Sequence, residues 1–202
     1  KPNDSLIAFS LRACAISLLL GVSAFSQDVT LESLVAEGRT AMEEKNWSQA
    51  LDLHTQAAIR FGQEDALRNF GAQFGAIFYH KGVCEMKLRK WTEAMQSFET
   101  CYRDFPNTGK DPGNLFQILA LCKWGEAAMG AEDWELAASR FAKFAGERDR
   151  LRDKFPQGAF YVNTAVCQYK LGHIPEGNEN LEIAIQNKAD FPTPESGIVA
   201  GF

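Results

Sequence analysis

The chain has 202 residues, of which 46% are hydrophobic and 23% charged, a composition typical of a packed globular protein and not of a disordered one. The 26 acidic residues outnumber the 21 basic ones, and the formal net charge is −5. Because no basic field is available to attract phosphate backbones, we expect no nucleic acid partner.

Residues 1–26 differ from the rest and have the order of a secretory signal peptide. Lys1 stands at the start, an apolar run follows from Ala13 to Ala24, and Ser26 provides a second small residue at the end. The run is shorter than the roughly 20 apolar residues that span a bilayer. We expect cleavage, export to the periplasm or the extracellular space, and no membrane insertion afterwards. A buried N-terminal helix and an uncleaved anchor are the alternatives.

The remainder of the chain repeats. Four stretches align, which are MEEKNWSQALDLH from Met42, MKLRKWTEAMQSF from Met86, MGAEDWELAASRF from Met129 and the more diverged YKLGHIPEGNENL from Tyr169. Each has one large residue at its centre, here called the anchor, and the four anchors are Trp47, Trp91, Trp134 and Ile174. A near-constant spacing of 40 to 44 residues between anchors indicates a repeated structural unit.

The columns around the anchors have constant character. Small residues stand nine before and three after an anchor, and a large residue stands seven after it. The positions that we expect to build the repeats are Gly38, Trp47, Ala50, Gly82, Trp91, Ala94, Phe98, Gly125, Trp134, Ala137 and Phe141.

This spacing predicts two closely packed helices in each unit. Residues four apart before the anchor, and residues three or four apart after it, lie on one side of a helix. Small residues let the two backbones approach, and the large residue beside them fills the remaining volume. Asn46 and Asp133 are good N-caps for the second helix, unlike Lys90 and His173. We expect the anchor to pack into the corner between the two helices.

These residues resemble the tetratricopeptide repeat, whose signature combines glycine and a small residue in the first helix, an aromatic corner, and alanine, aromatic and alanine in the second. The resemblance covers Leu31 to about Pro192 and implies an all-α superhelix, a solenoid of antiparallel helical hairpins. An irregular helical bundle or another array of helical hairpins is the alternative.

The expected repeat domain spans 27–192 and is followed by a tail, or the start of a continuation, at 193–202. The family's usual unit has about 34 residues, fewer than the spacing found here. We therefore place extra residues after each second helix, in GQEDALRNF, PNTGKDPGN and ERDRLRDKFPQG, where prolines stop helices. The four units are expected at about 31–62, 75–106, 118–149 and 158–189.

The sequence contains no pattern of catalysis, of metal binding or of cofactor binding. His54, His80 and His173 lie far apart, with no second ligand at metal spacing. The cysteines after residue 26, namely Cys84, Cys101, Cys122 and Cys167, mostly occupy small-residue positions, which favours buried thiols over disulfides or a metal site. Cys84 and Cys101 are the pair for which a bridge is the alternative. We expect a protein that is not an enzyme and has no cofactor.

The remaining candidate for function is a surface. The resemblance implies that the first helices line a concave face. Its residues would be Val35, Arg39, Met42, Tyr79, Val83, Met86, Cys122, Glu126, Met129, Val162, Val166 and Tyr169. The recurrent methionines predict either a compliant stripe for an apolar partner segment or, more simply, the packing seam between units.

The lysines and asparagines with which related co-chaperones hold a terminal carboxylate are missing from these positions. We expect an exported, non-catalytic scaffold that binds another protein or peptide along the concave face. The alternatives are the N-terminal recognition arm of a longer envelope enzyme, or a structural component of a cell-envelope assembly.

Overall fold

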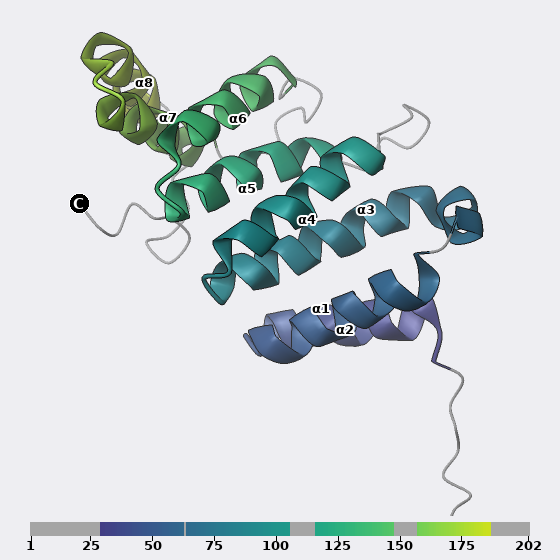
Figure 1. The fold of residues 1–202 in the computed structure, drawn as a ribbon. Helices are drawn as coiled ribbons and strands as arrows, with labels where there is room; N and C mark the ends of the chain where they lie inside the picture. The colour runs from purple at the N-terminus through teal and green to yellow at the C-terminus, as the bar shows by residue number, and fades with distance from the viewer. Residues whose placement is uncertain (1–28, 63, 106–115, 148–156, 187–202) are drawn as a thin grey trace, which may run out of the picture. The chain divides into compact units, whose positions relative to one another are not determined.

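The computed structural model describes residues 29–62, 64–105, 116–147 and 157–186, and these residues form eight α-helices without a strand (Figure 1). The helices are α1 (Leu31–Glu43), α2 (Trp47–Phe61), α3 (Glu64–Lys87), α4 (Trp91–Asp104), α5 (Phe116–Gly130), α6 (Trp134–Glu147), α7 (Gln157–Lys170) and α8 (Ile174–Gln186). The expected signal peptide and tail lie outside the described residues.

The helices pair as four hairpins, and consecutive helices pack on one another along the array. The first helices of neighbouring hairpins also meet, since α5 contacts both α3 and α7. Figure 1 shows the repeated arrangement most clearly from α3 to α6, where successive helices lie side by side. The expectation of an all-α array of antiparallel helical hairpins is confirmed.

One predicted loop is helical. Most of the stretch GQEDALRNF was expected to lie outside the helices, but α3 begins at Glu64 and continues to Lys87 without interruption. No proline interrupts this segment, and alanine, leucine and arginine at positions 66 to 68 are residue types of high helix propensity. The first helix of the second unit therefore starts well before the expected position 75. The other two predicted insertions fall mainly in 106–115 and 148–156, outside the described residues.

Each hairpin turns through the same backbone motif. The residue two before each anchor has a positive φ, which is 59° at Lys45, 58° at Arg89, 61° at Glu132 and 79° at Gly172. In the third turn, Glu132 N–H donates to Met129 O and Asp133 N–H donates to Ala128 O, and the other three turns have the equivalent bonds. These are the two hydrogen bonds of a Schellman motif, which ends the first helix with its last carbonyls satisfied.

The second helix begins immediately after this turn. Asn46 Oδ1 accepts a hydrogen bond from Gln49 N–H at 3.4 Å, and Asp133 Oδ1 accepts one from Leu136 N–H at 3.1 Å. Lys90 occupies the same position before α4 without a side-chain capping bond. The N-caps predicted from the sequence are confirmed.

Inside each of the first three hairpins, a glycine of the first helix lies against a ring of the second. A Cβ added to Gly38, Gly82 or Gly125 would lie within 2.8 Å of the ring of His54, Phe98 or Phe141, respectively. The three rings are fully buried. The glycine therefore lies against the ring, because the missing Cβ is the space that the ring occupies.

The tryptophan anchors reach the next hairpin. Lys87 Nζ lies 5.7 Å from the centre of the Trp47 ring, and Lys170 Nζ lies 5.4 Å from that of Trp134. A Cβ added to Gly130 would lie 2.7 Å from Cε3 of Trp91. In all three cases the covering residue stands four before the next anchor. The anchors therefore contribute to packing between units, in addition to the expected corner of their own hairpin.

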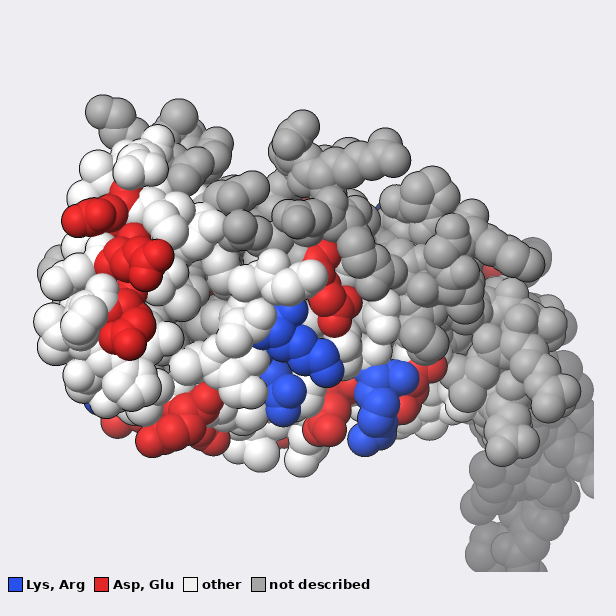
Figure 2. Space-filling model, turned by 90° about the horizontal axis from the view of Figure 1, so that it is seen from above, with Lys and Arg blue, Asp and Glu red and all other residues white. Residues whose placement is uncertain are grey.

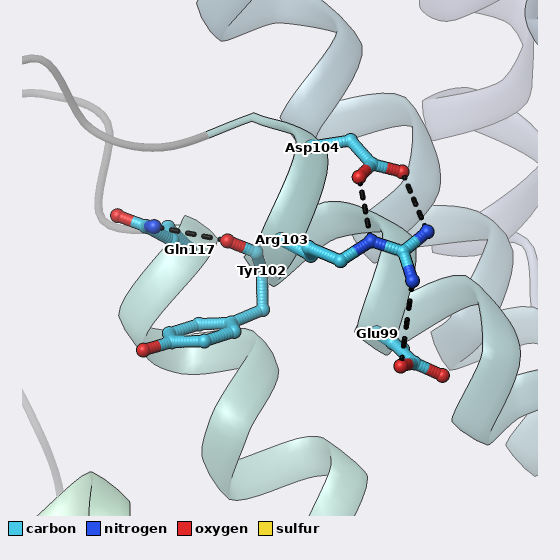
Figure 3. Close-up of polar contacts among 5 residues, drawn as sticks. All are labelled: Glu99, Tyr102, Arg103, Asp104 and Gln117. Atoms are coloured by element: carbon cyan, nitrogen blue, oxygen red, sulfur yellow. Dashed lines mark hydrogen bonds and ion pairs between the residues drawn. The ribbon is translucent and has the colours of Figure 1, made fainter.

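A polar contact joins α4 to α5. Gln117 is buried at the start of α5, and its Nε2 donates to the Tyr102 carbonyl oxygen at 2.9 Å (Figure 3). This bond satisfies a carbonyl in the last turn of α4, where no further helical partner exists. Arg103 forms ion pairs with Asp104 and Glu99 on the exposed side, where such pairs contribute little to stability (Figure 3).

Candidate interaction surface

The twelve residues expected to line the concave face occupy three equivalent positions in α1, α3, α5 and α7, and are here called the first-helix row. The positions are twelve, eight and five residues before each anchor. Because they are spaced by four and three residues, they follow one side of each first helix.

Most of the first-helix row is partly accessible. Arg39 is exposed, Cys122 and Met129 are buried, and the other nine residues are half-buried. The half-buried side chains of the row therefore pack against the core and also expose apolar surface for contact with a partner.

The three methionines pack against core side chains. Met42 contacts the cluster that contains Ala50 and Cys84, and Met86 contacts the cluster of Phe98 and Trp124. Met129 is 4% exposed and belongs to the core cluster of α5, α6 and α7. These positions lie in the seams between helices, while Met42 and Met86 keep part of their surface accessible.

The centre of the row contains a polar group. Lys123 Nζ donates to Glu126 Oε2 at 2.6 Å, and Cys122 Sγ lies 3.8 Å from Glu126 Oε1. Burial by itself would lower the pKa of Lys123, but the adjacent Glu126 carboxylate raises it overall, so the lysine stays charged. Burial also raises the pKa of Tyr79, on the neighbouring α3, to about 12. The centre of the row is therefore a neutralised ion pair beside an un-ionised tyrosine.

The α1 end of the row contains a different set of charges. His54 and His80 have their ring centroids 5.3 Å apart, and burial together with the nearby Arg39 lowers both pKa values to about 4. Both histidines are therefore neutral at physiological pH. No ion pair among the described residues includes Arg39, whose exposed guanidinium is left as an available cation of the row.

The α7 end of the row is closed by its own hairpin. Tyr169 lies against Gly177, and its hydroxyl donates to Asn178 Oδ1 at 2.9 Å. Val162 and Val166 remain half-buried on α7. The structure thus brings the predicted residues into equivalent places on successive first helices, with a cation at one end and valines at the other.

Among the described residues, the arrangement most similar to a catalytic group of side chains lies away from this row. Lys81 Nζ donates to Glu85 and, at 2.9 Å, to Ser97 Oγ, which in turn donates to Glu85 Oε2 at 2.6 Å. Ser97 and Glu85 are each 3% exposed, so a substrate has no access to the hydroxyl group. This trio joins α3 to α4 and is a structural contact.

The thiols are also structural. Cys84, Cys101, Cys122 and Cys167 are buried and free, and Cys101 Sγ donates to the Gly75 carbonyl oxygen at 3.0 Å. Burial raises the pKa of Cys84, Cys101 and Cys167 to about 12, which suppresses the reactive thiolate. Within the described part of the chain, no three histidine, cysteine or acidic side chains are grouped as metal ligands.

Two features of the surface were missed by the sequence analysis. Lys123 was not placed on the row, although its i,i+3 spacing to Glu126 on an expected helix was visible. The contact between His54 and His80 joins different hairpins, and no local sequence pattern predicts it. Among the described helices, none has the length and apolar character required to cross a membrane.

The comparisons with known proteins agree with this geometry. Among curated proteins, none matches the chain. The family model of the tetratricopeptide repeat matches residues 76–108, which include the second half of α3 and all of α4. A repeat of this kind suggests a scaffold for protein–protein interaction and is typically non-catalytic. The matched hairpin, together with the three that share its turns, glycine–ring contacts or anchor register, supports a tetratricopeptide-like repeat architecture.

Proposed function

We propose that this protein is an exported, non-catalytic scaffold that binds a segment of another protein along the first-helix row. The observation that carries the proposal is the row itself, in which apolar side chains of successive first helices stay partly accessible. In a helical array the first helices of neighbouring units form one continuous surface, so an extended partner segment contacts several hairpins at once.

The charges of the row favour a particular kind of segment. The ion pair of Lys123 and Glu126 neutralises the centre, while the exposed Arg39 at the α1 end has no partner among the described residues. A segment with apolar side chains along its length and a carboxylate near Arg39 is complementary to this arrangement. The order of residues 1–26 supports export, since a charged start, an apolar run and small residues are typical of a signal peptide.

Selection of displayed random peptides on the full chain tests this function. We expect the enriched peptides to contain apolar residues and an acidic one. Their binding should weaken by about tenfold or more in Arg39→Glu and in Val83→Asp, because each change removes complementarity on the row. Arg60→Glu is the matched control, since Arg60 is also exposed but lies on α2.

Melting curves of the variants separate loss of binding from loss of folding. Enriched peptides that bind the wild type and all three variants equally would refute the row as the binding surface. Mass spectrometry of the protein from the exporting cell tests the signal, and a mature chain that retains residues 1–26 would contradict its cleavage.

A further inference from the structure

The outer side of α8 differs from the equivalent side of the other second helices. The residues at the anchor and at seven and eleven positions after it follow one side of each second helix. In α8 these residues are Ile174, Leu181 and Ile185, here called the terminal apolar face. They are 51%, 39% and 60% exposed. Large hydrophobic side chains with this exposure are concentrated on α8 among the described residues.

Two of these three positions are covered in the preceding hairpins, whereas the equivalents of Ile185, namely Ala58, Tyr102 and Ala145, are half-buried or exposed. Leu181 corresponds to His54, Phe98 and Phe141, which are all fully buried. Ile174 corresponds to the three tryptophan anchors, each of which lies against the first helix of the next hairpin. The terminal apolar face is therefore equivalent to the surface that, in the earlier hairpins, is covered by the first helix of the next hairpin.

The opposite end of the array does not present such a face. In α5, the positions that turn towards the preceding helix hold apolar or small residues, including Ala120, Trp124 and Ala127. The equivalent positions of α1 hold Ser33, Glu37, Thr40 and Glu43. Among the described helices, α1 thus presents a polar face to solvent and α8 an apolar one.

The charges of α8 indicate what kind of helix would cover the terminal apolar face. The charged residues of α8 are Glu176, Glu179 and Glu182, all exposed, and α8 has no lysine or arginine. At 3.6 residues per turn, Glu182 lies beside the terminal apolar face, on the side away from the buried Gly177 and Ala184, and Glu179 lies further round the helix on that same side. Figure 2 shows acidic side chains gathered at the end of the array formed by α8, while basic ones gather nearer to the middle.

A second copy of the chain is a poor occupant for this face. Two α8 helices placed together would oppose their glutamates, and α1 of another copy would bring Glu37 and Glu43 to the same place. A basic helix is a better match, because the helices that cover the equivalent surfaces within the array also supply basic residues. Two of the three covering helices bring a lysine to the anchor, Lys87 from α3 and Lys170 from α7.

We propose that the terminal apolar face binds an amphipathic helix of a partner protein, with an apolar stripe flanked by lysine or arginine. The helix would lie on α8 as α3 lies on α2, with its stripe over Ile174, Leu181 and Ile185 and its nearest cation beside Glu182. This surface is separate from the first-helix row, because it lies on a second helix.

Binding of a defined peptide to the full chain tests the proposal. The probe is a fluorescent 18-residue peptide of leucine, alanine and lysine with the leucines on one helical side, and its counterpart has glutamate for each lysine. Fluorescence anisotropy should show the lysine peptide binding at least about tenfold more tightly. Ile185→Lys should weaken its binding by about tenfold or more, because it places a cation within the apolar face.

Ile59→Lys is the matched control, since Ile59 is 72% exposed on α2 and the variant changes the net charge equally. It should bind the peptide like the wild type. Both positions are exposed, so both variants should keep the wild-type melting temperature.

Three results would overturn the proposal. The first is equal binding by Ile185→Lys and Ile59→Lys, and the second is equal affinity for the two peptides. The third is that another part of the protein occupies the face. A dimer in sedimentation equilibrium that Ile185→Lys dissociates would assign it to a second copy, and peptide binding only after removal of residues 187–202 would assign it to this chain's own segment.

Discussion

At the scale of the residue, His54 occupies the position that Phe98 and Phe141 take in the next two hairpins. Its ring fits against Gly38 as the phenylalanines fit against Gly82 and Gly125. Neither of its nitrogens has a hydrogen-bond partner within the described structure, although the side chain is fully buried. An unpaired buried polar group destabilises a fold by about 1–3 kcal/mol. The His54 ring therefore packs as well as the phenylalanine rings do, but its two nitrogens lack hydrogen bonds.

The variant His54→Phe should therefore be more stable than the wild type and less sensitive to acid. The folded-state pKa of His54, about 4, lies below the ordinary histidine pKa of 6.5, so the unfolded chain binds a proton first as the pH falls. His54 thus weakens folding progressively between pH 6.5 and pH 4, by up to roughly 3 kcal/mol, and contributes no such loss above pH 6.5. Urea unfolding at pH 7.5 and 4.5 measures both effects.

The exposed His173 provides the control for this experiment, because His173→Phe changes a histidine outside the core. An unchanged difference between the two pH values in His54→Phe would contradict the assignment. His80 also has a pKa lowered to about 4, so part of the acid sensitivity should remain in the variant.

The trio of Lys81, Glu85 and Ser97 is the second feature of the residue scale. Ser97→Ala removes a hydroxyl group that accepts from Lys81 and donates to Glu85, leaving a buried carboxylate short of a donor. We expect a loss of about 1–3 kcal/mol in the free energy of unfolding. Ser139→Ala, at an exposed position of α6, should change stability by less than about 0.5 kcal/mol. Chemical denaturation of both variants measures the difference, and equal stabilities would show that the trio is dispensable.

At the scale of the element, the hairpin turns are alike in geometry and different in residue. The left-handed conformation is held by Lys45, Arg89 and Glu132 in three turns and by Gly172 in the fourth. Side chains with a Cβ adopt it at a cost of about 1–2 kcal/mol, whereas glycine adopts it freely. The Schellman hydrogen bonds therefore impose the conformation on residues that do not favour it.

Substitutions at glycine and at non-glycine residues of these turns should change the free energy of unfolding in opposite directions. Gly172→Ala should lower the free energy of unfolding by about 1 kcal/mol, and the cause is backbone strain alone, since an added Cβ meets no atom within 4 Å. Glu132→Gly should raise it by about 0.5–1 kcal/mol, because the strain at this position is relieved. Thermal melting followed by circular dichroism measures both. A stabilised Gly172→Ala variant would contradict the turn geometry.

At the scale of the whole molecule, the array is a chain of neighbouring contacts, and its hairpins are expected to open unequally. Each hairpin packs mainly on the next, so a hairpin at the end has fewer contacts to lose than one in the middle. The hairpin of α7 and α8 also exposes the terminal apolar face.

The four buried thiols report this difference. Cys167, on α7, should react first with iodoacetamide, while Cys101 and Cys122, between neighbouring hairpins, should react last. Pulsed alkylation read by mass spectrometry assigns the order of reaction. A cysteine introduced at exposed Ser139 should react much faster than all of them, because burial and raised pKa values suppress the native thiolates. Equal rates for Cys101 and the introduced cysteine would contradict the core positions.

The sequence by itself determined the hairpins. The i, i+4 spacing of small and large residues and the capping residues Asn46 and Asp133 act over three to five residues within one helix or turn, and the recurrence of the anchors every 40 to 44 residues shows that this local pattern is repeated. Such local rules can be read from the chain without knowledge of its neighbours. The second helices begin at Trp47, Trp91, Trp134 and Ile174, the anchors themselves.

Only the tertiary structure decided how hairpins meet. It placed Trp91 on Gly130, brought His54 beside His80 and left the terminal apolar face exposed. These contacts depend on the rotation of one hairpin against the next and on which side chains then share a volume. Because that rotation is set by packing across about forty residues of sequence, no short pattern encodes it.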